Sequence, residues 1–384
     1  MSALAQAPTA EALAHFWAGP GASLPLVEEC AVDGEVLVTF CWRDDHAGQV
    51  LLFANRLADE TNLAASLLSR IPGTDVWHLT YRLGADWRGS YSFLTAGPGD
   101  PAPWDTGGDH VALRSALDGG RPDPRNPDTC VNRSGVTQSV AALPAAPGQP
   151  WLSARTEVMP GTVEATRLPD GRRAWLHRPA GCSADSPLPL LVVLDGEVWL
   201  GSQALPVTLD NLAATHPHAR WHTVFVESQG IQRRWRELSA DGGGLQHVVD
   251  VVEWAGRRCE VVPGPRHVTV AGQSLGALTA LRCVLGAASV VGNAVAHSAS
   301  LWQDPLTDVL AEFGRGPADG FVHLSHGAQE WVLAPEHDAL ARRMRAAGMR
   351  VEAHTYNGGH DYACWRGGIA EGLLGVASYR NRPA

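Results

Sequence analysis

The stretch RHVTVAGQSLGALTALRCVLG, residues 266–286, decides the fold of the carboxyl-terminal part of this chain. A run rich in β-branched residues leads into a Gly-x-Ser-x-Gly pattern, and a helix-forming run leads out of it. A serine on a sharp turn between a strand and a helix is the setting in which this pattern carries a nucleophile. The chain has 41 glycines, so the pattern alone leaves Ser274 as either a nucleophile or an ordinary helix-capping serine.

The sequence on either side of this turn indicates two domains. After residue 151, continuous apolar runs such as LPLLVVLDG and WHTVFVES alternate with helix-like segments, which predicts a mostly parallel α/β sheet covered on both faces. GTVEATRL and RRAWLHRPAG, which precede them, predict an antiparallel pair of strands. The first 142 residues show short alternating strands between turn signals, typical of a β-sandwich. LPAAPGQPW predicts a linker, so we expect a β-sandwich domain at 1–150 and an α/β domain at 151–384.

The composition is that of an ordinary globular protein with an acidic balance. The formal net charge is −10 and all 30 basic residues are arginine, which argues against nucleic acid as a partner. No apolar run approaches the ~18 residues needed to cross a bilayer, and the first residues do not resemble a signal peptide. The 7 cysteines lack metal-binding spacing and predict reduced thiols. We therefore expect a cytoplasmic location, no membrane partner, and no cofactor or metal of the protein's own.

A serine nucleophile needs a base and an acid. TYNGGHDYACW places His360 in a glycine-rich loop after the last predicted strand, which fits the α/β-hydrolase order of serine, acid, histidine. Glu330 lies just past the preceding strand and is the favoured acid, with the role of orienting the imidazole. Asp338 is the alternative, although it is expected to belong to the following helix. Four other histidines near strand ends are interpreted as solvated or packing residues: His297, His323, His326 and His337.

Backbone amides near the turn predict an oxyanion hole. One donor is the N–H of Leu275, the residue after the serine. The second is expected from the loop DGEVW, at Gly196 or Glu197. In comparable enzymes each such donor lowers the barrier by about 3–4 kcal/mol.

A cluster of arginines and one tryptophan follows the strand WHTVFVES. In IQRRWRELSADGGG, Arg233, Arg234 and Arg236 flank Trp235. A solvated charge run is the simpler interpretation. The segment nevertheless lies at the edge of the sheet where ligands bind, and Arg with Trp suits planar anionic aromatic ligands. Contact with a ligand is therefore favoured, with Arg234 and Arg236 as the best candidates.

Four segments of the carboxyl-terminal half resemble one known family. GGHDYACWRGG resembles the GGHDYAWWR signature of the enterochelin (ferric enterobactin) esterases, and LLVVLDGEVW resembles their LLDG-x-x-W loop. RWREL matches their R-x-R-E-L element, and AGQSLGALTAL matches their elbow. VTFCWRD, PGTDVWHLTYRL, RGSYSF and DPRNP in the amino-terminal half are also similar to that family and occur in the same order. The resemblance therefore covers nearly the whole chain.

This resemblance implies a serine esterase that hydrolyses the trilactone esters of a ferric catecholate siderophore such as enterobactin in the cytoplasm. It implies an immunoglobulin-like amino-terminal sandwich, with Ser274 as nucleophile and His360 as base. Four residues are expected to hold the substrate, through guanidinium groups and indole faces: Arg234, Arg236, Trp199 and Trp235.

The sequence departs from the family pattern at two places. Ala277 replaces a usual second glycine, and HSASLW differs from QSGSFWW. Some relatives manage with a Ser–His pair, so the acid is open between Glu330, Asp338 and none. Two alternative functions also remain, because a fold does not define a substrate. One is a general carboxylesterase or acyltransferase, and the other is a non-catalytic siderophore- or glycan-binding protein.

Overall fold

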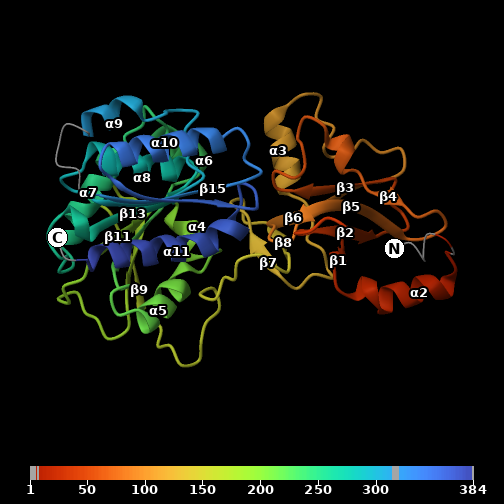
Figure 1. The fold of residues 1–384 in the computed structure, drawn as a ribbon, viewed down its shortest axis with the longest axis horizontal. Coiled ribbons are helices and arrows are strands. Elements are labelled where there is room, and N and C mark those ends of the chain that lie inside the picture. The colour runs from red at the N-terminus through yellow and green to blue at the C-terminus, as the bar shows by residue number, and fades with distance from the viewer. Residues whose placement is uncertain (1–5, 7, 314–319, 383–384) are drawn as a thin grey trace. The chain divides into compact units, whose positions relative to one another are not determined.

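The computed structural model describes residues 6, 8–313 and 320–382 (Figure 1). It divides into two compact units. The first comprises Met1–Pro147 and Asn357–Cys364, and the second comprises Gly148–Tyr356 and Trp365–Ala384. The sequence places the domain boundary at 150/151 and does not anticipate that a late segment of the chain packs with the first unit.

The first unit is an antiparallel β-sandwich. One sheet has the order β1-β2-β5-β4, and the other has the order β3-β6-β8-β7. The strand bounds are β1 Leu26–Glu29, β2 Glu35–Arg43, β3 Gln49–Ala54, β4 Ser69–Arg70, β5 Val76–Gly84, β6 Arg88–Ala96, β7 Thr129–Val131 and β8 Thr137–Ala142. Alternate residues of the two sheets meet in one core, for example Phe40 of β2, Leu52 of β3 and Phe93 of β6. The alternation in the sequence therefore predicted this fold correctly.

Short helices accompany the two sheets. They are α2 Ala10–Ala18, η1 Pro20–Ala22, η2 Leu63–Ser66 and α3 His110–Asp118. α2 and α3 pack against the strand residues that alternate with those of the inter-sheet core. Asp109 caps α3 by accepting hydrogen bonds from the N–H groups of Val111 and Ala112 at 2.9 and 3.0 Å.

The second unit is built on one sheet with the order β16-β15-β14-β13-β11-β12-β10-β9. Its strand bounds are β9 Thr162–Arg167, β10 Arg173–Arg178, β11 Leu190–Val193, β12 His222–Val226, β13 Val268–Gln273, β14 Asn293–His297, β15 Phe321–Gly327 and β16 Arg350–Tyr356. β11 to β16 pair in parallel, and β9 and β10 form the expected antiparallel pair. All the parallel strands therefore end at one edge, where α/β proteins bind ligands.

Helices cover both faces of this sheet. Their bounds are α4 Gly196–Leu200, α5 Leu205–Thr215, α6 Ile231–Leu238, α7 Gly244–Gly256, η3 Pro265–His267, α8 Leu275–Gly286, α9 Thr307–Phe313, α10 Ala334–Ala346 and α11 Tyr362–Arg380. In Figure 1, α8 and α10 lie on one side of the sheet, and α5 and α11 lie on the other. The main core of this unit includes Val192, Val270, Leu278 and Leu340. The α/β fold and its preceding β domain thus confirm the predicted fold class.

Two further features bear on the expectations from composition. All seven cysteines are free thiols. Among the described residues, no helix combines the length and the apolar character that a membrane span requires.

Candidate active site

Ser274 lies on a strained turn between β13 and α8. Its backbone adopts φ 57° and ψ −119°, a combination that a residue with a side chain rarely takes and that persists only where the surroundings impose it. The loop after β14 supplies that constraint. The Ser274 N–H donates to the carbonyl of His297 at 2.9 Å, and the Ser300 N–H donates to the Ser274 carbonyl at 3.2 Å. The Ser274 hydroxyl lies 3.3 Å from that of Ser300.

The two glycines of the elbow do not have the same importance. A Cβ atom at residue 272 would lie 2.5 Å from the carbonyl carbon of Gly276, so the turn closes only if residue 272 is glycine. A Cβ atom at residue 276 would lie 3.5 Å from Cβ of Leu194, which is ordinary contact. The tight turn therefore requires glycine at residue 272 and not at residue 276.

The predicted oxyanion donors lie at the first residues of two neighbouring helices. α8 begins at Leu275 and α4 begins at Gly196, and the strands that precede these helices, β13 and β11, are paired. N–H groups at such positions have no acceptor within their own helix. A Cβ atom at residue 196 would lie 2.3 Å from the backbone nitrogen of Val226, so only glycine allows α4 to start so close to β12.

Arg234 has a structural role behind this turn, and its contact with a ligand stays a prediction. Its side chain is 7% exposed and forms a two-pronged ion pair with Asp195, at 2.7 and 2.8 Å. The same guanidinium donates to the backbone carbonyl of Gln273 at 3.3 Å. The Gln273 amide in turn donates to Asp195 at 2.8 Å. Arg234 therefore joins α6 to the residue before Ser274 and to the loop before α4.

Trp199 is also part of this support, and its contact with substrate stays a prediction. The residue is 1% exposed, and its indole N–H donates to the side-chain oxygen of Gln273 at 2.8 Å. The loop motif that suggested this tryptophan is thus explained by packing. Sequence reasoning missed Asp195 and Gln273, although both directly adjoin residues that it selected.

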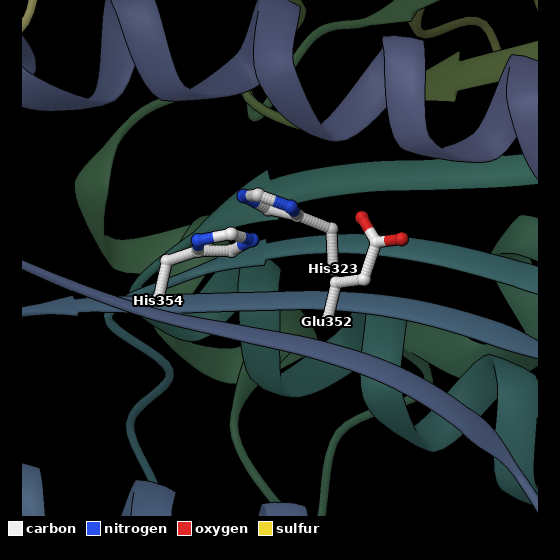
Figure 2. Close-up of side chains that lie close together, drawn as sticks. All are labelled: His323, Glu352 and His354. Carbon is white, nitrogen blue, oxygen red and sulfur yellow. The ribbon is translucent and has the colours of Figure 1, made fainter.

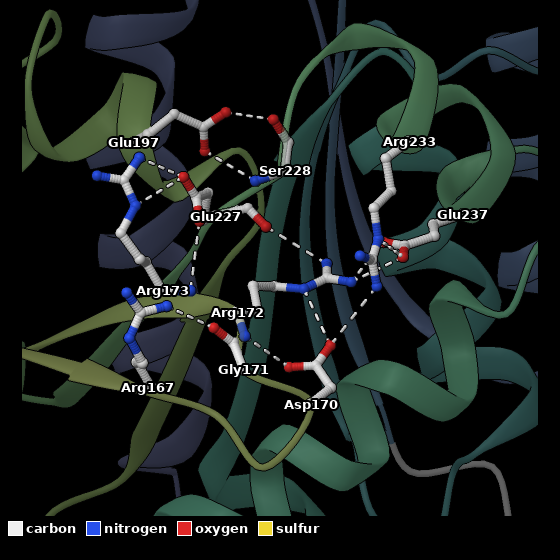
Figure 3. A network of polar contacts seen from close by, with 10 residues as sticks. All are labelled: Arg167, Asp170, Gly171, Arg172, Arg173, Glu197, Glu227, Ser228, Arg233 and Glu237. Atoms are coloured by element: carbon white, nitrogen blue, oxygen red, sulfur yellow. Dashed lines mark hydrogen bonds and ion pairs between the residues drawn. The ribbon is translucent and has the colours of Figure 1, made fainter.

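The remaining charges beside α6 form the ion-pair network in Figure 3. Arg172, 4% exposed, bonds Asp170 and Glu237, and Arg233 bonds Glu237 across one helical turn at 2.7 Å. Burial alone would raise the pKa of Glu237, but hydrogen bonds from Arg233 and Arg172 outweigh it and hold that pKa below its ordinary value. In the same network the Glu197 carboxylate accepts from the Ser228 N–H at 2.9 Å, which ties α4 to the loop after β12.

The exposed part of α6 presents Trp235 and Arg236 to solvent. Their contact with a ligand stays a prediction. Trp235 is 45% exposed, and its ring lies 6.2 Å from that of Trp302, which is 57% exposed. Trp331, in the loop after β15, is 63% exposed. Exposed indoles therefore follow three strands at the same edge of the sheet. Sequence reasoning missed Trp302 and Trp331, although HSASLW contains the first of them.

Glu330 is buried in the loop after β15. Three donors converge on its Oε1 atom: the Ser298 hydroxyl at 2.6 Å, the Gly327 N–H at 3.0 Å and the Tyr356 hydroxyl at 3.2 Å. The Trp365 indole N–H supports this cluster by donating to the hydroxyls of Ser298 and Tyr356, both at 3.0 Å. Asp338, the alternative acid, is exposed on α10. Between the two, the buried and anchored Glu330 is the better placed to hold a fixed orientation.

His360 lies between β16 and α11, in the segment that packs with the first unit. The Asn357 amide donates to Asp86 at 2.6 Å, and its carbonyl accepts from the Arg88 N–H at 2.9 Å. The Asp361 carboxylate accepts hydrogen bonds from the N–H groups of Ser90 and Ala363. The β-sandwich thus holds the histidine-bearing loop on both sides of His360.

Family comparisons agree with this architecture. Residues 37–152 match the family described as "Enterochelin esterase, N-terminal", and residues 165–376 match "Putative esterase". The iron(III) enterobactin esterase of Dickeya dadantii is 30% identical, with 91% of this chain and 89% of that protein covered. The chain belongs to the enterochelin esterase family.

Other enterochelin esterase relatives extend the likeness over the full length of the chain. The iron(III) salmochelin esterase of Escherichia coli O6:H1 is 29% identical over 94% of this chain and 93% of that protein. The crystal structure of the ferric enterobactin esterase from Salmonella typhimurium has a TM-score of 0.78 at 26% identity, with 95% and 98% of the two chains covered. That of the Shigella flexneri enzyme, determined in the presence of enterobactin, has a TM-score of 0.75 at 26% identity, with 91% and 95% covered.

Membership of the enterochelin esterase family confirms the resemblance that the sequence motifs indicated. It makes the chain a carboxylic ester hydrolase with an amino-terminal β domain. The roles of individual residues follow from the geometry above and are developed next.

Proposed function

We propose that this protein hydrolyses the ester bonds of a ferric catecholate siderophore such as enterobactin, and so releases iron in the cytoplasm. The observation that carries the proposal is the strained backbone of Ser274 beside the first residues of α8 and α4. Such strain is retained where it serves a function, and here it turns a hydroxyl toward the ligand-binding edge of the sheet. The substrate class is suggested by the relatives, which are iron(III) enterobactin and salmochelin esterases.

In the proposed reaction, the Ser274 Oγ atom attacks an ester carbonyl carbon while the His360 imidazole takes its proton. The N–H groups of Leu275 and of Gly196 or Glu197 stabilise the negative oxygen of the tetrahedral intermediate. Collapse of the intermediate breaks the ester bond, and the imidazolium protonates the departing alkoxide. Water, activated by the same imidazole, then hydrolyses the acyl-serine.

Glu330 is the proposed acid of this group. A carboxylate that accepts the second imidazole N–H selects the correct tautomer and stabilises the imidazolium. The three donors on Oε1 hold the carboxylate in one orientation.

Substrate recognition is assigned to the exposed side chains at the sheet edge. A ferric tris-catecholate carries net negative charge, and the protein also has a formal net charge of −10. A local cationic side chain is therefore needed to offset the repulsion between them. Arg236 supplies that charge, and Trp235 and Trp302 supply flat faces for catechol rings. No metal of the protein's own takes part in these steps.

Mass analysis of products tests the proposal. Purified protein is incubated with ferric enterobactin and, separately, with a short p-nitrophenyl ester. We expect stepwise cleavage of the triester, with one water added for each ester opened, and a higher kcat/KM than for the simple ester. Equal or better turnover of the p-nitrophenyl ester would instead identify a general carboxylesterase.

A second measurement separates the esterase from a non-catalytic binder. Ser274→Ala is expected to bind ferric enterobactin without cleaving it. Binding is measured by the quenching of tryptophan fluorescence. Ser300→Ala removes the neighbouring hydroxyl and is expected to lower turnover far less. Wild-type protein that binds the siderophore but never cleaves it would support the binding function.

A further inference from the structure

Three metal-ligating side chains lie together on β15 and β16, in the middle of these strands. They are His323, Glu352 and His354, and the ligand atoms they offer all lie within 4.8 Å of one another. His323 and Glu352 are opposite each other in the parallel register, and His354 is two residues further along the same face. Figure 2 shows the three side chains projecting to the same side of the sheet, with the two imidazole rings nearly parallel. Their ring centroids are 4.8 Å apart.

The helix above this cluster leaves room for it. A Cβ atom at Gly372 of α11 would lie 3.0 Å from Cδ2 of His323, and one at Gly375 would lie 2.8 Å from a carboxylate oxygen of Glu352. Glycine in a helix interior costs about 1 kcal/mol relative to alanine. α11 therefore contains glycine where it faces these polar groups, which allows them to lie between the helix and the sheet.

His323 gives the second, independent indication of a ligand. The residue is 1% exposed, and within the described part of the chain neither ring nitrogen has a hydrogen-bond partner. A buried polar group left unpaired costs about 1–3 kcal/mol, so such groups call for an explanation.

We propose that His323, Glu352 and His354 bind a divalent transition-metal ion of borderline softness, such as Zn²⁺. Two imidazole nitrogens and one carboxylate are a common ligand set for such ions, with water completing the coordination. His354 is exposed and Glu352 is half-buried, so an ion has access from solvent. The acidic balance of the whole chain also favours a cation.

The ligand atoms of the three side chains must move only slightly closer together to bind one ion. Ligand atoms about 2.0–2.1 Å from one ion can be no more than about 4.2 Å apart. Rotation of the two accessible side chains, Glu352 and His354, can supply the remaining approach to the buried His323. The bound ion would join the edge strand β16 to β15. It lies mid-strand rather than at the carboxyl edge of the sheet, so it takes no part in the esterase reaction.

Titration of the full-length, untagged protein tests this site, after treatment with a chelator and its removal. Binding of Zn²⁺ is measured by calorimetry, and Co²⁺ is used as a probe because its visible absorption reports nitrogen and oxygen coordination. We expect one equivalent of each ion, a dissociation constant for Zn²⁺ at or below about 10 µM, and a rise in Tm on binding.

Variants locate the bound ion. His354→Ala and Glu352→Gln, both at accessible positions, are expected to weaken Zn²⁺ binding at least about 100-fold and to abolish the Co²⁺ spectrum. His46→Ala removes a 92% exposed imidazole elsewhere and should leave both measurements unchanged. Failure of the wild-type protein to bind one equivalent, or equal binding by the two cluster variants, would overturn the proposal. Neither result depends on which ester the protein cleaves.

Discussion

The loop that carries Ser274 and the loop that carries His360 are held in place by different parts of the chain. Ser274 is constrained mainly by residues within about one structural repeat of the second unit. β13 precedes it, α8 follows it, Gly272 packs directly against Gly276, and its backbone bonds His297 and Ser300 of the next strand and loop. The His360 loop is held by residues far away in sequence. Asp361 bonds the backbone of Ser90, which is 271 positions earlier.

This difference explains why the proposed nucleophile and the proposed base are not equally easy to recognise from the sequence. A nucleophile turn is encoded locally, so a short motif is informative. The position of the base depends on a separately folded β-sandwich, so its motif describes only the loop and not what anchors it. The amino-terminal unit therefore includes the His360 loop and holds it by contacts of its own.

The largest predicted effect comes from removing either proposed reacting group. Ser274→Ala and His360→Ala are each expected to lower kcat by about 10³–10⁶-fold, and the double variant should be no worse, because the two groups act as a unit. Steady-state cleavage of ferric enterobactin, followed by mass analysis, measures this. If the losses multiply in the double variant, the two side chains act independently, and the prediction that they act as a unit is wrong.

The local character of the nucleophile turn is tested by its two glycines. Gly272→Ala forces a Cβ atom to within 2.5 Å of the Gly276 backbone. It is expected to destabilise the fold by about 2–3 kcal/mol. We expect kcat to fall about 100-fold, because a small displacement of a nucleophile is costly.

Gly276→Ala is the matched control, since its new methyl group meets only ordinary contacts. Its unfolding free energy should stay within about 1 kcal/mol of the wild type. Urea unfolding and turnover of both variants provide the measurements. Equal losses in the two variants would mean that the backbone contact at Gly272 does not maintain the turn.

The sequence predicted the features that depend on local pattern. Alternating apolar residues indicated the sandwich, buried runs indicated the parallel sheet, and the strand–turn–helix context of Ser274 indicated the elbow. The burial of Arg234 and Trp199 was not predicted, because it depends on the direction in which a side chain points. Arg234 looks like part of a solvated run, and only the burial of Asp195, 39 residues away, shows that it is paired in the core.

Features assembled from distant strands could not be predicted from the sequence either, because they depend on how residues far apart in the chain are arranged in the fold. Trp302 and Trp331 come from different loops, and only the order of the strands brings those loops to one edge. His323 and His354 were not connected in the sequence analysis, because their contact depends on the register of β15 against β16. Register between parallel strands joined by a helix has no short-range signature.

The third prediction separates the two arginines that the sequence treated alike. Arg234→Gln leaves Asp195 buried without its cation, so we expect a loss of about 3–5 kcal/mol in unfolding free energy and about a 10–100-fold fall in kcat. Arg236→Gln changes an exposed side chain and should leave stability within about 0.5 kcal/mol, while raising KM for the anionic substrate. Urea midpoints and the separate kcat and KM values test this. A raised KM with unchanged stability in Arg234→Gln would identify that residue as a ligand contact.

The smallest predicted effect tests the long-range anchor of His360 itself. Asp361→Asn leaves one acceptor oxygen for the two N–H groups, of Ser90 and Ala363, that the carboxylate accepts, so the loop loses a buried hydrogen bond without losing volume. We expect kcat to fall about 10-fold with KM changed less than about twofold, because the imidazole is misplaced while the binding residues are untouched.

A general loss of stability in the first unit would not produce that split between kcat and KM. Asp109→Asn is the matched control, because Asp109 also accepts two backbone N–H groups, at the start of α3 and away from the His360 loop. Each variant should lose about 1–3 kcal/mol or less in thermal or urea unfolding. If both variants lower kcat to the same extent, the β-sandwich influences turnover through stability alone. If only Asp361→Asn does so, the sandwich positions the base, and the contrast between the locally built nucleophile and the remotely anchored histidine holds.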